Sequence, residues 1–154
     1  MIEVKNLSAA YDGVPVFQNI NFTLNDGSFT ALCGKNGSGK STLLLLMAGI
    51  IPAGLKYSGE ILINGKNIFT IKRQDAAQNV SLLLQSETPA WNISVRQFIE
   101  TGLYSYGRLP QAECTRAVDE ALEKIGITAF ADKRLFNISG GEFQKCRLAR
   151  CFAQ

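Results

Sequence analysis

Residues 34–41 form a glycine-rich segment whose spacing is typical of phosphate binding. The segment reads Gly-Lys-Asn-Gly-Ser-Gly-Lys-Ser and fits the pattern Gly-x-x-x-x-Gly-Lys-Ser/Thr. Glycines let backbone N–H groups turn toward phosphate oxygens without clashes from Cβ atoms, and a helix that begins near Lys40 would point its positive dipole end at them. Lys40 would bridge the β and γ phosphates, Ser41 would bind Mg²⁺, and Thr42 would add a hydrogen bond. The alternative is a glycine-rich turn that contains Gly-Lys-Ser by chance.

A second motif, Ile138-Ser139-Gly140-Gly141-Glu142, precedes an amphipathic run from Phe143 to Phe152. Ser139 and Glu142 have the Ser-x-x-Glu spacing of a capping box at a helix N-terminus. Two consecutive glycines cost a helix roughly 1 kcal/mol each relative to alanine, and a cap needs neither of them. Close approach of the backbone to a phosphate would explain the glycine pair, so the capping and binding interpretations both stay open on local grounds.

The elements that must position these motifs follow from periodicity and turn residues. Strands are expected at residues 2–7, 16–24, 28–33 and 80–84, the last as a buried parallel strand. A hairpin is expected at Asn64-Gly65, because both central residues of a type I′ turn need positive φ. Helices are expected at 40–47, from Ser94 onward, after Pro110 and from Ser139 to Gln154. Strand, glycine loop and helix therefore occur in the order that a phosphate loop requires.

Composition is that of an ordinary globular chain of about one domain. Of 154 residues, 46% are hydrophobic and 19% are charged, and the net charge of +3 comes from scattered basic residues that form no continuous surface for nucleic acid. The N-terminus lacks a secretory signal, so a cytosolic protein is expected, and the most apolar segment, 43–55, is too short and interrupted for a membrane helix. The four cysteines show no Cys-x-x-Cys spacing and histidine is absent, so neither a zinc site nor a disulfide framework is expected.

Together the two glycine motifs resemble the ATPase domain of ABC proteins, in which a P-loop is followed by a Leu-Ser-Gly-Gly-Gln signature. The resemblance covers the whole chain and implies that Tyr11 stacks on adenine and that Gln85 contacts magnesium and the attacking water. Departures from the family pattern occur at four positions: Lys35 and Leu84 replace residues that are usually proline, Ile138 replaces leucine, and Glu142 replaces glutamine. None of them removes a phosphate contact.

The resemblance implies an α/β fold of the P-loop NTPase class, ABC ATPase type, with an N-terminal antiparallel β-subdomain and a helical subdomain, the C-terminal part of the core being absent. Residues 1–154 would form an incomplete domain: 1–85 the β-subdomain and P-loop core, 86–138 the helical subdomain, and 139–154 the signature helix. The residues expected to act in hydrolysis are Lys40, Gln85, Ser139 and Gly141. The nucleotide contacts are expected at Tyr11, Gly34, Lys35, Asn36, Gly37, Ser38, Gly39, Lys40, Ser41, Thr42, Ser139, Gly140, Gly141 and Glu142, and the magnesium ligands at Ser41 and Gln85.

In the family, two such domains face each other head to tail and hold ATP between the P-loop of one and the signature of the other. The implied partners are a second ATPase domain and membrane permease subunits, with no nucleic acid, and the implied location is the inner face of the cell membrane. Residues 91–108, which include Ile93-Ser94-Val95-Arg96, resemble the subgroup that imports iron chelates, haem or cobalamin.

The family also needs an apolar strand ending in Asp-Glu and then a histidine, both downstream of the signature, and neither is present before Gln154. A product of these residues alone is expected to bind ATP without appreciable turnover, because general-base assistance is worth about 10² to 10⁴ in rate. It is also expected to be marginally stable or aggregation-prone, because the P-loop strand lacks its neighbour.

Two alternatives remain. One is an ABC ATPase of DNA repair or translation, but the stretch between Gln85 and Ser139 has no room for a long coiled coil. The other is an ATP-binding remnant without hydrolysis.

Overall fold

The computed structural model describes residues 1–85 and 87–154, and the chain divides into two compact units, Met1–Val80 and Ser81–Gln154. Ser86, the first residue of the predicted helical subdomain, lies outside the described residues. The predicted subdomain boundaries therefore stay a prediction. Within the described part of the chain, no helix is long and apolar enough to cross a bilayer.

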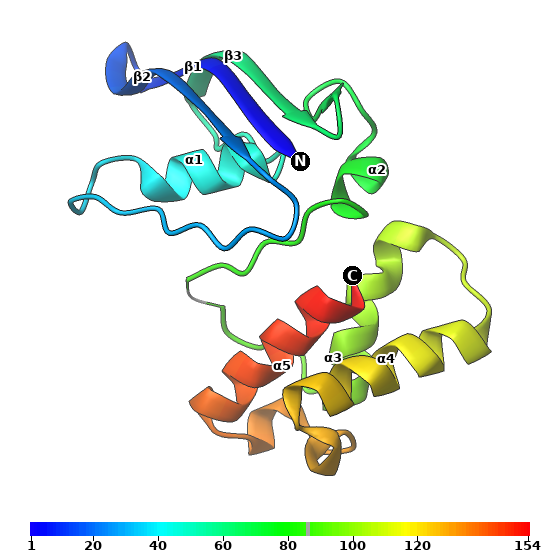
Figure 1. Ribbon diagram of the computed structural model, residues 1–154. Helices are drawn as coiled ribbons and strands as arrows, with labels where there is room; N and C mark the ends of the chain where they lie inside the picture. Colours follow the sequence, from blue (N-terminus) through cyan, green and yellow to red (C-terminus); the bar gives the residue numbers. More distant parts are fainter. Residues whose placement is uncertain (86) are drawn as a thin grey trace. The chain divides into compact units, whose positions relative to one another are not determined.

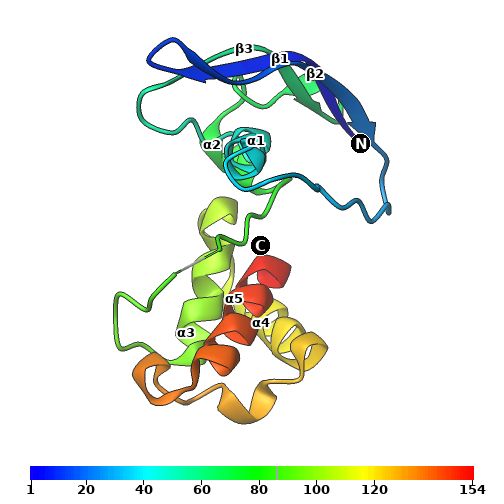
Figure 2. The ribbon, with the colours of Figure 1, turned by 90° about the vertical axis from the view of Figure 1, so that its left-hand side faces the viewer.

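The first unit is an antiparallel sheet packed on one helix. Strand β1 (Ile2–Tyr11) pairs with β2 (Val14–Leu24) on one side and with β3 (Leu55–Ile63) on the other, and the short β4 (Lys66–Asn67) pairs with β3, giving the order β2-β1-β3-β4. Helix α1 (Lys40–Met47) lies along one face of this sheet (Figures 1 and 2), and the five-residue helix α2 (Arg73–Ala77) follows β4. The sheet and α1 together position the glycine loop.

The core of the first unit lies between the sheet and α1. Leu7, Ile61 and Leu46 are all fully buried in one cluster, with strand residues contributed by the inner face and leucines contributed by the helix. The alternation along β1 is broken at Asn6, whose φ of 49° accompanies a shift in the strand register. This bulge lets both Val4 and Leu7 face the core although they are three residues apart.

Most of the predicted local structure of this unit is present. The hairpin at Asn64-Gly65 is confirmed, with φ values of 50° and 77° as a type I′ turn requires. The predicted helix at 40–47 is confirmed by α1, and the strands predicted at 2–7 and 16–24 lie inside β1 and β2.

The strands predicted at 28–33 and 80–84 are wrong for the described chain, which has no ladder at either segment. Phe29 is completely exposed, and Leu84 is 46% exposed. An apolar segment forms a strand only where a neighbour supplies hydrogen bonds to its backbone, and the described residues supply none there. Sequence pattern alone detects the apolar run but not the absence of its partner.

The second unit is a helical bundle. Helices α3 (Val95–Glu100), α4 (Gln111–Ile125) and α5 (Gly140–Ala153) pack together (Figure 1), and three 3₁₀ turns connect them: Thr101–Tyr106, Thr128–Phe130 and Leu135–Asn137. Ser94 and Pro110 are the N-caps of α3 and α4, as the sequence predicts. The core is a separate cluster that includes Ile99, Leu122 and Cys146, all fully buried.

Candidate nucleotide-binding site

The glycine loop ends in a turn that opens α1. Gly37 and Gly39 have φ of 80° and 84°, in the left-handed region that favours glycine, and Gly39 is the N-cap of the helix. The backbone N–H of Leu43 donates to the carbonyl of Gly39 over 2.9 Å, which starts the helical ladder. The loop N–H groups and the positive end of the α1 dipole therefore lie at one place, which is the arrangement that binds phosphate.

The side chain of Lys40 is held by hydrogen bonds to the backbone of this loop. The ammonium group donates to the carbonyl oxygens of Gly34 and Lys35, each over 2.7 Å. An ammonium group has three donors, so two of them fix the side chain across the loop and the third remains for a ligand. The charge of Lys40 is consequently fixed beside the backbone of Gly34 and Lys35, and its contact with phosphate stays a prediction.

Gly39 is also in close contact with the hairpin formed by β1 and β2. A Cβ atom at position 39 would lie 2.5 Å from Cγ1 of Val16 and 3.0 Å from Cδ1 of Phe17. Tyr11, the predicted adenine contact, pairs with Val14 at the turn of the same hairpin and is half-buried. The hairpin that carries Tyr11 is thus packed on the glycine loop. Sequence reasoning missed Val16 and Phe17, because no motif marks an apolar residue that packs on a glycine.

The magnesium candidate Ser41 is exposed in the first turn of α1, and Thr42 beside it is half-buried. Gln85, the other magnesium candidate, is exposed and belongs to the second unit. Tyr11, Lys40 and Ser41 therefore belong to the first unit, whereas Gln85 and residues 139–142 belong to the second. The shared coordination of magnesium by Ser41 and Gln85 stays a prediction.

The motif at 138–142 opens α5 with the capping box that local spacing predicts. The hydroxyl of Ser139 accepts from the N–H of Glu142 over 3.2 Å, and a carboxylate oxygen of Glu142 accepts from the N–H of Ser139 over 2.7 Å. These bonds lower the pKa of Glu142, the backbone N–H of Ser139 having the largest effect. The side chains of this motif are therefore engaged with each other.

The two glycines of this motif are not required by the chain's own packing. Gly140 and Gly141 have ordinary helical backbone angles, and a Cβ atom at either would meet nothing within 4 Å. Their N–H groups have no acceptor among the residues that the structure describes. An exposed helix start with free donors and open space is compatible with a ligand that approaches from outside.

Comparison with known proteins decides the family. The family model for ABC transporters matches residues 17–154, which is most of the chain. The chain belongs to the ABC transporter family. The resemblance predicted from the two glycine motifs is therefore confirmed.

The similar relatives are ATP-binding proteins of import systems. The chain is 34% identical over 154 residues to the hemin import ATP-binding protein HmuV of Chelativorans sp. (strain BNC1), covering all of this chain and 57% of that protein. It is 33% identical over 156 residues to the petrobactin import ATP-binding protein YclP of Bacillus subtilis (strain 168), covering all of this chain and 60% of that protein. The chain thus spans less than two thirds of the length of these relatives.

Solved structures share the fold. CbiO1 of Clostridium perfringens, described as part of the ABC transporter complex cbiONQ, matches with a TM-score of 0.82 and 29% identity over 99% of this chain and 61% of that one. An antiparallel sheet with a P-loop helix and a helical unit are thus the N-terminal portion of an ABC ATPase, and the predicted fold class is confirmed. The strands wrongly predicted at 28–33 and 80–84 change local structure but leave this fold class unchanged.

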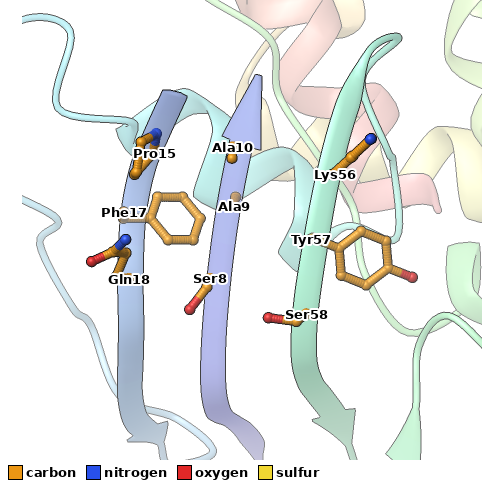
Figure 3. A pocket seen from close by; sticks show the side chains of 9 residues that line it. All are labelled: Ser8, Ala9, Ala10, Pro15, Phe17, Gln18, Lys56, Tyr57 and Ser58. Carbon is orange, nitrogen blue, oxygen red and sulfur yellow. The ribbon is translucent and has the colours of Figure 1, made fainter. Parts of the chain in front are cut away.

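The ABC transporter chain also has a cavity that no motif predicts. It has a volume of about 290 Å³ and lies across β1, β2 and β3, where Ser8, Phe17 and Lys56 line it (Figure 3). The hydroxyl of Ser8 already accepts from the N–H of Asn19 over 2.9 Å. None of the predicted nucleotide or magnesium residues lines this cavity, so it is not the P-loop site.

Proposed function

We propose that this protein binds ATP with Mg²⁺ at its P-loop and acts as the ATP-binding subunit of an importer that couples ATP hydrolysis to transport. The observation that carries the proposal is the pair of hydrogen bonds from Lys40 to the carbonyls of Gly34 and Lys35, which hold an ammonium charge at the N-terminus of α1. A cation fixed beside a helix N-terminus and a turn of exposed N–H groups suits a triphosphate.

The loop fits this cofactor. Gly37 is exposed, and a Cβ atom there would meet nothing within 4 Å, so the space above the turn is open to phosphate oxygens. Ser41 follows Lys40 and offers the hydroxyl that Mg²⁺ takes as a ligand, and Gln85 would complete the contact to magnesium and to the attacking water. When bound, Mg²⁺ would neutralise charge on the phosphates. Tyr11 would stack on the adenine ring.

We propose further that two copies of the ATPase domain associate head to tail around ATP. The support is the start of α5, where Gly140 and Gly141 leave open space and N–H groups that no residue described by the structure accepts. In a dimer these donors would meet the γ-phosphate held by the partner's P-loop, and the helix dipole would add to the attraction. The capping box keeps this helix start in place while leaving those donors available.

A membrane permease is the proposed partner of the second unit. A cavity of about 180 Å³ lies there, bordered by Trp91, Tyr104 and Arg150 among others. Trp91 is 72% exposed and Tyr104 is 75% exposed, and large aromatic side chains at a hollow are characteristic of protein interfaces. Such a partner would hold the subunit on the inner face of the cell membrane.

The proposed cargo is an iron chelate, haem or cobalamin. Support comes from the names of the relatives above, which import hemin and petrobactin. Residues 1–154 by themselves are proposed to bind ATP without appreciable turnover, because the family's Asp-Glu strand and histidine are not among them. A steady-state phosphate-release assay tests this, and ordinary turnover would refute it.

The decisive test of the site is binding of a fluorescent ATP analogue with Mg²⁺ to Lys40→Ala, with Lys66→Ala as the matched control. Lys66 is an exposed lysine of β4 in the same unit and is not among the predicted nucleotide contacts. We expect Lys40→Ala to lose at least about tenfold in affinity, since one charge-assisted contact is worth about 1.5–3 kcal/mol. Lys66→Ala should bind as the wild type does. Unchanged affinity in Lys40→Ala would remove the P-loop assignment.

The transport role has its own test. An affinity-tagged full-length protein should co-purify with a hydrophobic permease, whereas ribosomes or DNA in its place would favour a non-transport ABC ATPase. Trp91→Ala should weaken the permease association, and Val14→Ala is the control because Val14 is 68% exposed but lies in the first unit.

A further inference from the structure

Residues before and after Gln85 in the sequence form hydrogen bonds with helix α5. The hydroxyl of Ser81 donates to the carbonyl of Cys151 over 3.1 Å, and the guanidinium of Arg147 donates to the carbonyl of Leu84. After Gln85, the carboxylate of Glu87 accepts from Arg147 over 3.1 Å and from Arg150 over 3.0 and 2.9 Å. All of these residues belong to the second unit, so the contacts lie within one body.

Arg147 is the centre of this arrangement. Its side chain is only 2% exposed, and each of its nitrogens has a partner: Nε with Glu87, Nη1 with Gln144 over 2.7 Å, and Nη2 with the carbonyl of Leu84. Arg150 is held beside it, with its guanidinium 4.5 Å from the ring centroid of Phe98. The buried charge is thus fully compensated, and Glu87 provides the only negative charge among its described partners.

A buried arginine is a poor choice for stability alone. Removing a guanidinium from water costs more than burying an apolar side chain of the same volume, and apolar replacements of buried ion pairs are often neutral or stabilising. An arginine adds geometric specificity, because its planar guanidinium group donates hydrogen bonds in fixed directions and so requires its acceptors at fixed positions. Here those partners are the residue immediately before Gln85 and the residue two positions after it.

Helix α5 also carries the signature at its N-terminus. Arg147 lies seven residues after Gly140, which is about 10 Å along a helix. A helix of this length packed in a core behaves as a rigid rod, so its two ends move together. A displacement of Leu84 or Glu87 would therefore be passed through Arg147 to the start of α5.

We infer that Arg147 and Glu87 are positioning residues that fasten Gln85 to α5, so that Gln85 and the Ser139–Gly141 signature respond to ATP–Mg²⁺ as one body. This inference rests on the proposed function, because it takes Gln85 as the residue that contacts magnesium and the attacking water. Neither Arg147 nor Glu87 touches the nucleotide. Their task is to couple two segments that do.

The charge state of Glu87 agrees with this task. Burial acts to raise its pKa, but hydrogen bonds and the positive charges of Arg150 and Arg147 outweigh burial, and the pKa is lowered overall. Glu87 is therefore ionised at neutral pH, as its ion pairs with Arg147 and Arg150 require.

Amide hydrogen exchange of the full-length protein tests the inference, measured with and without ATP–Mg²⁺ in wild type, Arg147→Met and Glu87→Gln. Methionine is unbranched and apolar, so it replaces the aliphatic part of the buried arginine without its charge. Glu87 is partly exposed, so Glu87→Gln is the variant less prone to misfold. The matched control is Arg96→Met, which removes another ion pair of the second unit, Arg96 with Asp119 at 2.7 Å, away from Gln85.

Without nucleotide, we expect peptides covering 81–87 to exchange at least about tenfold faster in Arg147→Met and several-fold faster in Glu87→Gln, while peptides of α4 stay as in wild type. With ATP–Mg²⁺, wild type and Arg96→Met should slow peptides 81–87 and 139–143 together, whereas Arg147→Met should slow them unequally. A loss of packing alone would speed exchange throughout the bundle and would leave any response to nucleotide parallel in the two peptides.

The inference is overturned if peptides 81–87 exchange within about threefold of wild type in both variants, or if their response to nucleotide stays parallel to that of 139–143. Failure of the proposed function is a different result, in which wild type does not bind ATP. The measurement without nucleotide still decides the fastening in that case.

Discussion

A Cβ atom on Gly39 would lie 2.5 Å from Cγ1 of Val16, a distance that real side chains do not adopt. The last glycine of the phosphate loop is therefore constrained twice, by its left-handed φ of 84° and by the β1–β2 hairpin packed against it. The same hairpin carries Tyr11, the predicted adenine contact, so the packing of Val16 and Phe17 on Gly39 ties this hairpin to the phosphate loop.

Substitution of Gly39 tests this dependence. Gly39→Ala should destabilise the first unit by about 2–5 kcal/mol, since left-handed backbone costs roughly 1–2 kcal/mol and overpacking about 1–3. Affinity for ATP–Mg²⁺ should fall at least about tenfold. Gly65→Ala is the control, because Gly65 has φ of 77° but a Cβ atom there meets nothing within 4 Å. Urea unfolding measures the loss of stability in both variants, and the larger loss expected in Gly39→Ala gives the effect of the clash with Val16 beyond that of backbone strain. Equal losses of stability would contradict a close contact between position 39 and Val16.

The capping box at Ser139 allows a matched pair of substitutions. Ser94 caps α3 with the same reciprocal arrangement, accepting from Gln97, so Ser139→Ala and Ser94→Ala should each cost about 1 kcal/mol of stability. Only Ser139→Ala should also weaken nucleotide-dependent association of two ATPase domains, measured by light scattering with and without ATP–Mg²⁺. Equal association of the two variants would limit Ser139 to a capping role.

Stability at acid pH should depend on Glu87. Its pKa in the folded protein is lowered from the usual 4.5, so its contribution is fully present above pH 4.5 and is lost as the pH falls through the lower folded value. Wild type should exceed Glu87→Gln by about 2 kcal/mol at pH 7, the value of a charged hydrogen bond, and the two should converge in acid. Urea titrations between pH 7 and pH 3 measure the difference, and a difference independent of pH would show that the carboxylate charge has no role.

Cys146 should be chemically inert in the folded protein. Burial raises its pKa to about 11, with a smaller effect of the Glu142 charge, so only about one thiol in a thousand is ionised at pH 8. Iodoacetamide should therefore modify Cys146 only after unfolding, as judged by peptide mass spectrometry in buffer and in urea. Fast labelling in buffer would mean that the core around α5 opens readily.

The parts of this protein that could be predicted from sequence are those that depend on neighbours in the chain. The phosphate loop, the Asn64-Gly65 turn and the Ser139–Glu142 cap are each specified within a few residues, by backbone angles or by hydrogen bonds that span one turn. The family followed from the order of two such motifs. The roles of the individual site residues remain predictions.

The parts that failed or were missed depend on distant residues. Residues 28–33 have the composition of a strand, but a strand also needs a neighbour, and composition cannot supply one. The sequence does contain a pattern that predicts pairing of Arg147. This residue lies on the face of α5 that includes Phe143 and Cys146, and a charged side chain on an apolar face is rarely buried without a partner. Its partner Glu87 is 60 residues away, which no local pattern reveals.

The separation of the two hydrophobic cores has a consequence for how the protein is made. Among the described residues, every buried member of the first core lies at or before Ala76, and every one of the second lies at or after Val95. The first core can close while the rest of the chain is still on the ribosome, since domains fold as units during synthesis. The second cannot, because α5, which carries Cys146 and Ala149 into it, is translated last of the three helices. A pause in translation before α5 would leave α3 and α4 exposed to chaperones while the P-loop helix is already packed.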